Sequence, residues 1–218
     1  VYINHHLLYK TARDVLDLFR SIVPVIHASD IATIPRTAAI LHNDCVYINH
    51  HLLTLGLEYK EEYAKKIRDN DNSAENSPHR LPPQLLTFID CIPLFRDIAT
   101  NTLQQTFLTR QKNQVTSIIA TRVTHLTPSL KMNEAVNEWT EAETGVRAVH
   151  YHLHHLAQAW KVILSRDVYG RCMGFLVDTA LAVLLHCVMR GDDISEAACH
   201  FVSTLFSDVL RVRELFDG

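Results

Sequence analysis

The sequence has few glycines and prolines, six and seven in 218 residues. β-Sandwiches and β-barrels need many tight turns, which glycine and proline mostly supply, so this scarcity disfavours both folds. A basic surplus is also missing, because 21 lysines and arginines stand against 24 aspartates and glutamates, a formal net charge of -3. Proteins that bind nucleic acid through its phosphates normally carry such a surplus, so we expect no nucleic-acid partner.

Cysteine pairs are absent as well, since the five cysteines are scattered and no two form a C-x-x-C pair. An odd, scattered set predicts reduced thiols in a cytosolic protein. The N-terminus shows no basic region followed by an apolar core, so we expect no signal peptide. The most apolar stretch, 172–189, is interrupted by Asp178, Thr179 and His186, which favours a buried helix over a membrane span.

Apolar residues recur at alternating steps of three and four along most of the chain, which is typical of amphipathic α-helices. One stripe consists of Ala38, Leu41, Cys45, Ile48, Leu52, Leu55 and Tyr59. A second consists of Trp139, Ala142, Val146, Val149, Leu153, Leu156, Trp160 and Ile163. No segment shows sustained strand alternation between turn signals. The sequence therefore predicts an all-α fold, an elongated antiparallel helical bundle or rod.

The stripes also predict where helices begin and end. A first helix is expected over 11–25, with apolar Val15, Leu18, Phe19, Ile22 and Val23, and should be closed by Pro24 and the polar stretch near Ser29 and Asp30. A tract over 84–123 should kink or break at Pro93, because proline interrupts helices. We expect the longest helix over 134–164.

The C-terminal third has signals of its own. A helix over 168–190 is apolar nearly all round and should lie in the middle of the bundle. Asp193 with Glu196 predicts a capping box for a last helix. Gly170 and Gly174 fall inside a helical pattern, where a missing side chain usually permits close packing.

These elements predict a division of the chain into a duplicated segment at 1–10, a helical pair at 11–68, a polar linker at 69–83 and a long-helix bundle at 84–218. We expect them to form one continuous rod-like domain. Residues 1–8 (VYINHHLL) repeat residues 46–53 letter for letter, but the similarity does not extend further. A structural repeat would span a whole supersecondary unit, so we treat the first copy as a local duplication.

Fourteen histidines suggest a metal site, and the densest group is His150, His152, His154 and His155. Residues three or four apart share a helix face, which pairs His150 with His154 and His152 with His155. The two pairs lie on different sides of the stripe, and a zinc site needs three or four protein ligands. The remaining ligands would come from elsewhere; the candidates are His186 with Cys187, Cys199 with His200, and the adjacent His50 and His51. A metal-binding helical enzyme that uses His150, His154 and a cysteine is therefore the alternative hypothesis.

Other catalytic signals are lacking. The sequence contains no G-x-S-x-G and no glycine-rich phosphate loop, so we assign no catalytic, cofactor-binding or metal-binding residue and expect no enzyme and no cofactor. A plain bundle that binds an apolar ligand between its helices is a third possibility. Long helices with narrow apolar stripes suit a scaffold that positions partners by helix–helix docking, and such a scaffold should expose an apolar patch where a partner docks.

Residues 34–56 (IPRTAAILHNDCVYINHHLLTLG) strongly resemble a segment of the Zeste-white-ten family of kinetochore and vesicle-tethering proteins. Three further stretches are similar, in the family's order. They are residues 88–93 with Phe95 and Arg96, then Trp160 with Val162 and Leu164, then Tyr169, Met173, Gly174, Thr179 and Ala180. The resemblance covers residues of about 11–208, and the chain corresponds to the C-terminal half of the family's members. Residues 1–8 have no counterpart in it.

This resemblance implies a helical rod of the multisubunit tethering-complex type and two cellular settings. At kinetochores and spindle, family members join Rod and Zwilch, recruit dynein–dynactin through Spindly and support the mitotic checkpoint. At the cytosolic face of the endoplasmic reticulum, they join a complex that tethers Golgi-derived vesicles, with membrane association only through partners. The C-terminal half is the part expected to dock on Rod or its interphase counterpart. No functional residue is carried over, because the family residues Ala38, Leu41, Ile48 and Leu52 are expected in the core.

Overall fold

The computed structural model describes residues 2–70, 87–123, 136–191 and 193–216. These residues form helices and contain no strand, which confirms the all-α prediction. They divide into two compact units, residues 1–103 and 104–218. The tethering-complex type stays a prediction.

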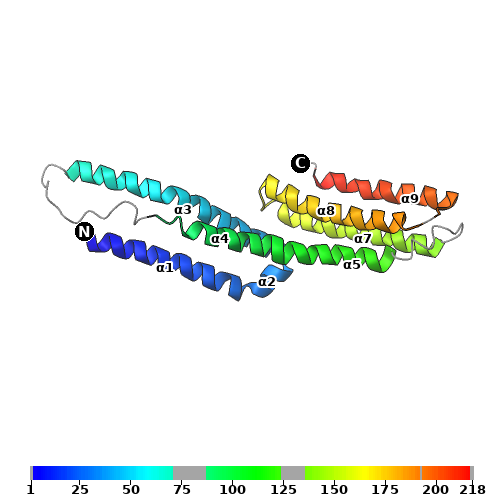
Figure 1. The fold of residues 1–218 in the computed structure, drawn as a ribbon, viewed down its shortest axis with the longest axis horizontal. Helices are drawn as coiled ribbons and strands as arrows, with labels where there is room; N and C mark the ends of the chain where they lie inside the picture. The colour runs from blue at the N-terminus through cyan, green and yellow to red at the C-terminus, as the bar shows by residue number, and fades with distance from the viewer. Residues whose placement is uncertain (1, 71–86, 124–135, 192, 217–218) are drawn as a thin grey trace. The chain divides into compact units, whose positions relative to one another are not determined.

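The first unit contains α1 (Tyr2–Ile26), α2 (Ala28–Thr33), α3 (Pro35–Asn70) and α4 (Cys91–Thr100). Figure 1 shows that α3 runs antiparallel to both α1 and α4. The stripe predicted on α3 forms much of the core: Ala38, Leu41, Cys45 and Leu52 are buried. Leu55, predicted on the same stripe, is 43% exposed and belongs to the surface described below.

Two boundaries in the first unit differ from the prediction. Helix α1 begins at Tyr2, nine residues before the expected start, and continues past Pro24 to Ile26. Pro93 does not break a helix, because it lies in the first turn of α4, where no intrahelical partner for its missing N–H is required. The helical backbone changes instead to a π-helix at η2 (Asn101–Leu108), between α4 and α5.

The second unit contains α5 (Thr109–Val123), α7 (Val136–Trp160), α8 (Arg166–Met189), α9 (Glu196–Val209) and the 3₁₀ segment η3 (Leu210–Leu215). In Figure 1 these four helices alternate in direction, as in an up-down bundle. The stripe predicted on α7 is buried from Ala142 to Trp160, and the Trp160 ring packs edge-on against Phe107 at 5.7 Å. The longest described helix is nevertheless α3, with 36 residues against 25 in α7.

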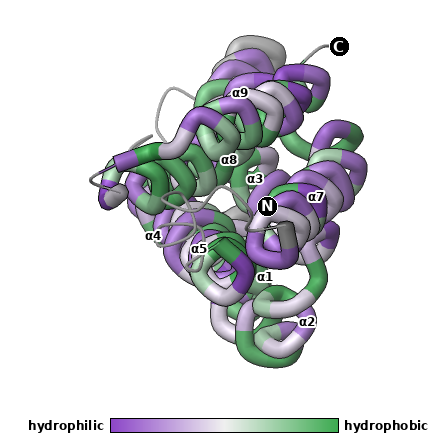
Figure 2. The backbone as a smooth tube through the Cα atoms, turned by 90° about the vertical axis from the view of Figure 1, so that its right-hand side faces the viewer, coloured by the Kyte–Doolittle hydropathy of each residue, from purple (hydrophilic) through white to green (hydrophobic). Residues whose placement is uncertain are grey.

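The central position predicted for the apolar helix α8 is wrong. Although the 18 most apolar residues of α8 have mean hydropathy 2.0, only 28% of that window is buried. Hydrophobic residues recur along α8 in Figure 2. Phe175, Leu185 and Met189 are exposed, because α8 packs mainly on α5 and α7 and leaves its other side uncovered. By length and composition α8 could cross a membrane, a test that core helices of soluble proteins also pass.

The last helix has a different cap from the one predicted. The hydroxyl of Ser195 accepts a hydrogen bond from the Ala198 backbone N–H at 3.2 Å, so Ser195 is the N-cap of α9. Asp193 lies two residues too early to fill this role, although Glu196 does lie in the first turn.

The division of the chain predicted from the sequence stays a prediction. Most of the predicted linker, 69–83, lies outside the described residues, and residues 69 and 70 complete α3. The boundary between the compact units falls after Leu103, because α4 packs on α3 and belongs to the first unit.

Candidate interaction surface

An apolar groove opens in the first unit between α1 and α3, with Phe88 beside it. Its free volume is about 560 Å³ and its lining is almost entirely apolar. The α1 wall consists of Leu8, Thr11, Ala12, Val15 and Leu16, and the α3 wall of Tyr47, Ile48, His51, Leu52 and Leu55. We call this surface the α1–α3 groove.

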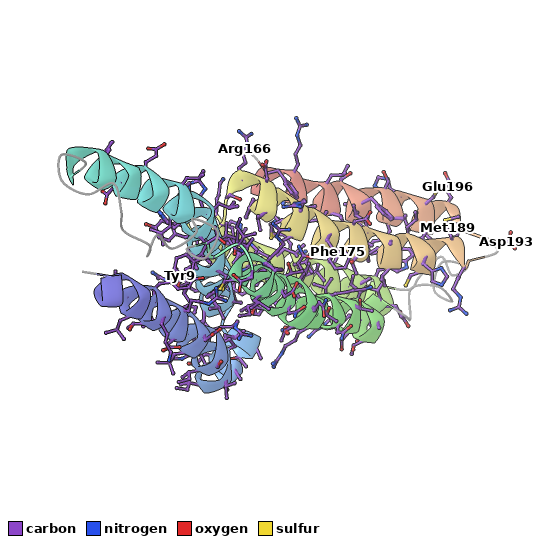
Figure 3. All side chains as sticks on the ribbon, turned by 60° about the vertical axis from the view of Figure 1, so that its left-hand side comes forward. Tyr9, Arg166, Phe175, Met189, Asp193 and Glu196 are labelled. Atoms are coloured by element: carbon purple, nitrogen blue, oxygen red, sulfur yellow. The ribbon has the colours of Figure 1, made fainter. Side chains whose placement is uncertain are left out.

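Contacts with the start of α4 hold one edge of α1. The Tyr9 ring, labelled in Figure 3, lies 5.0 Å from Phe88, and its hydroxyl donates to the Thr87 carbonyl at 3.0 Å. Further along α1, the ring centroid of Phe19 lies 6.0 Å from that of Phe95 on α4. These aromatic contacts fix α1 along its α4 side and leave the neighbouring apolar side chains facing the groove.

An ion pair strengthens the same edge. The Arg13 guanidinium donates to both carboxylate oxygens of Asp90 and to the Tyr9 hydroxyl. The hydrogen bond from Arg13 holds the pKa of Asp90 below its usual value, against the effect of burial. The positive charge of Arg13 is therefore directed toward α4 and is not available to the groove.

The groove continues into a wider uncovered apolar face on α1. Val15 and Leu18 are each 59% exposed, and Ile22 is 39% exposed. These three residues follow one another at steps of three and four, so they lie on one side of the helix. Monomeric proteins rarely leave such contiguous apolar surface uncovered unless it meets a partner.

In the second unit, the described residues of α8 also form an uncovered apolar face. Phe175, Leu185 and Met189 are exposed there, and Figure 3 labels the first and last. The Lys112 ammonium from α5 lies 5.6 Å from the Phe175 ring, a cation–π contact that covers this end of the face in part.

The histidines predicted as candidate ligands do not gather around one point. The rings of His150 and His154 stack at 6.4 Å, while His152 pairs with Gln111 and His154 with Gln158. The Nε2 atom of His150 is buried and has no hydrogen-bond partner. Among the residues the structure describes, no three or more His, Cys, Asp or Glu side chains could hold one metal ion. Within that part of the chain, the positions of the histidines give the metal-enzyme hypothesis no support.

The other ligands proposed from the sequence lie on three different helices. His50 and His51 lie on α3, Cys187 is partly buried on α8, and Cys199 is exposed on α9. Burial raises the pKa of the Cys45 and Cys172 thiols to about 11, and it also raises that of Cys187. Since the thiolate is the reactive and metal-binding form, burial makes these three thiols poor nucleophiles.

The apolar-ligand hypothesis depends on cavity size. Between α7, α8 and the end of α9 the second unit has a cavity of about 20 Å³, which could hold one water molecule and no larger ligand. The α1–α3 groove is large enough for a ligand, but it is an open furrow along two helices and lacks the few convergent polar groups that orient small molecules. The groove is better suited to another helix.

The sequence predicted an apolar patch but not its position. Val15, Leu18 and Ile22 are apolar positions of their helix together with Phe19 and Val23, and the pattern does not separate covered from uncovered ones. The signal that could have located the patch is the width of the apolar arc on α1. Phe19 and Val23 already supply a side that faces the core, and Leu18 and Ile22 lie about 100° away from it around the helix.

Comparison with known proteins gives two family matches. The family described as "Centromere/kinetochore protein zw10, C-terminal" matches residues 2–117, and "ZW10 C-terminal helical domain" matches residues 144–217. The first match begins at residue 2 and so includes the duplicated segment, for which no counterpart was expected.

Curated relatives agree with these matches. The centromere/kinetochore protein zw10 homolog of Mus musculus is 30% identical over 86% of this chain, and that of Rattus norvegicus is 29% identical over the same share. The homolog of Caenorhabditis elegans is 26% identical over 94% of the chain. The chain spans only 22% of the length of the mouse and rat proteins.

Proposed function

The chain belongs to the ZW10 family, and we propose that it is a non-catalytic scaffold segment of a kinetochore protein that positions partner subunits by helix–helix docking. The observation that carries this proposal is the uncovered α1–α3 groove, whose walls repeat apolar residues at helical spacing. The names of the mouse and rat relatives support the kinetochore setting.

The partners we propose are those that the family resemblance implies. In mitosis the chain would dock on the C-terminal region of Rod, in a complex with Zwilch that recruits dynein–dynactin through Spindly and supports the checkpoint. The protein would then be cytoplasmic and located at kinetochores and spindle. Both uncovered faces, on α1 and on α8, offer apolar area for such contacts.

The family resemblance also supports an interphase role. We propose that the same segment joins the tethering complex at the cytosolic face of the endoplasmic reticulum, which captures Golgi-derived vesicles. The chain would reach the membrane through its partners. Alternative docking of two partners on one surface would make the two roles exclusive at any moment.

A binding measurement with purified components tests this function. The chain, shown to be helical by circular dichroism, is titrated with the C-terminal region of Rod in a calorimeter. We expect saturable binding with a negative heat-capacity change, the signature of apolar burial. Absence of binding by the folded chain would contradict the scaffold role.

A further inference from the structure

We propose that the α1–α3 groove binds an amphipathic helix of a partner protein, in which lysine or arginine flanks the apolar stripe. This inference rests on the proposed scaffold function and adds the chemistry of the docked segment. It follows from the direction of the groove, the nature of its lining and the charges on its rim.

The groove has the direction and spacing that a helix requires. Leu8, Ala12 and Val15 line one wall at steps of four and three, and Ile48, Leu52 and Leu55 line the other in the same way. The furrow therefore follows the axes of two antiparallel helices. A helix that lies along this furrow would complete a four-helix arrangement with α1, α3 and α4. Its apolar side chains at positions i, i+3 or i+4, and i+7 would contact the two walls.

The lining gives little hold to a polar ligand. The polar groups among the groove's described lining are the hydroxyls of Thr11 and Tyr47 and the imidazole of His51. The Thr11 hydroxyl already donates to the Leu7 carbonyl at 2.9 Å, and the His51 ring packs at 4.2 Å from Tyr47. The occupant must therefore present apolar side chains over most of the contact.

The rim of the α3 wall is acidic. Positions 44, 48, 51, 55, 58 and 62 form one row at steps of four and three. Its middle members line the groove, and its ends are the exposed carboxylates Asp44, Glu58 and Glu62. Lys65 follows one turn later, and Arg13 on the other wall is held by Asp90. Basic side chains flanking the occupant's stripe would meet carboxylates beyond both ends of the apolar contact.

The same carboxylates disfavour two other occupants. A second copy of this chain, docked by the same face, would bring its own acidic row against this one, and like charges repel. A membrane surface carries anionic lipids, which attract basic segments and repel acidic ones. A basic amphipathic helix satisfies both the apolar lining and the acidic rim.

The test uses two synthetic helical peptides of about 20 residues, a length sufficient for helix formation. Both carry the same leucine stripe, and the flanking positions are lysine in one and glutamate in the other. Fluorescence anisotropy with the whole chain should show the lysine peptide binding about tenfold tighter or more, and this difference should shrink as salt rises.

Variants assign the binding to the groove. Val15→Asp places a charge in the exposed lining and should abolish binding. Leu57→Asp is the matched control, because Leu57 is 66% exposed on the opposite side of α3 and should leave binding unchanged. The double variant Glu58→Lys, Glu62→Lys should reverse the preference and favour the glutamate peptide.

The proposal is overturned if neither peptide binds, if both bind equally, or if Val15→Asp has no effect. A dimer of the chain that Val15→Asp dissolves would identify a second copy as the occupant and would also overturn it. These outcomes are separable from failure of the scaffold role. If Rod binds and tolerates both Val15→Asp and the double lysine variant, the scaffold role stands and the groove assignment fails.

Discussion

His152 on α7 and Gln111 on α5 are joined by a hydrogen bond, with Nε2 of the imidazole 2.8 Å from Oε1 of the amide. Gln111 is 4% exposed and His152 is half-buried. Because the amide oxygen is an acceptor, the imidazole carries its hydrogen on Nε2. The pair therefore gives a polar side chain in the core a partner across two packed helices.

Replacement of this histidine should cost stability. His152→Ala removes a partner from the buried Gln111 amide, and we expect a loss of about 1–3 kcal/mol in the free energy of unfolding. His154→Ala is the control, because His154 is exposed and its substitution should change stability by less than about 0.5 kcal/mol. Urea denaturation measures both, and equal, negligible effects would show that the α5–α7 bond contributes nothing.

The same histidine should make stability depend on pH. Burial, and secondly the charge of His155, lower the pKa of His152 below its ordinary value of 6.5. The unfolded chain therefore binds a proton at a pH where the folded chain does not. The contribution of His152 is complete above about pH 6.5, and it is lost as pH falls toward the lower folded-state pKa. Denaturation midpoints of the wild type should fall more steeply over that window than those of His152→Ala; parallel curves would refute this assignment.

Glycines on two helices should respond in opposite ways to alanine. A Cβ atom on Gly145 would lie 2.9 Å from Cβ of Arg122, so α5 and α7 would have to separate. We expect Gly145→Ala to destabilise by about 1–3 kcal/mol. Gly174 has nothing within 4 Å of an added Cβ, and Gly174→Ala should stabilise by up to about 1 kcal/mol through helix propensity. Thermal unfolding of the two variants shows whether each substitution raises or lowers stability. A change in the same direction for both would contradict this packing.

The cap of α9 can be tested with a neighbouring pair of substitutions. Ser195→Ala removes the hydroxyl that accepts from the Ala198 N–H and should cost about 1 kcal/mol. Asp193→Ala, two residues earlier, should have little effect. If Asp193→Ala lowered the free energy of unfolding more than Ser195→Ala in urea denaturation, Asp193 would be the N-cap, as the sequence predicted, and the assignment to Ser195 would be wrong.

Periodicity predicted the helices and most of the core. Ala142, Leu153 and Trp160 are buried as their three-four spacing indicated, since burial of one helix face is what maintains that spacing. The same reasoning failed for α8, because a helix that is apolar on every side does not indicate which side meets its neighbours. Close packing was expected at Gly170 and Gly174, but the structure shows it at Gly145 instead. The sequence could not distinguish these positions, because it does not show which residues of a neighbouring helix face each glycine.

The position of the candidate surface could not be predicted from the sequence and became clear only from the structure. Val15, Leu18 and Phe19 are all strongly apolar, yet Phe19 packs on Phe95 while the other two are exposed. Which part of a wide apolar arc is covered depends on α4, a helix that follows more than sixty residues later in the chain. For the histidines the sequence was informative, because helical spacing already placed the two pairs on different sides of α7, and among the described residues no three potential ligands converge on one point.

The most direct test of the scaffold account compares Rod binding by the wild type, Val15→Asp and Leu57→Asp in one calorimetric series. The account predicts that Leu57→Asp matches the wild type and that Val15→Asp raises Kd about tenfold or more, since an aspartate would be desolvated without a partner. Equal Kd values for all three proteins, each fully helical, would contradict the claim that the α1–α3 groove is where a partner docks.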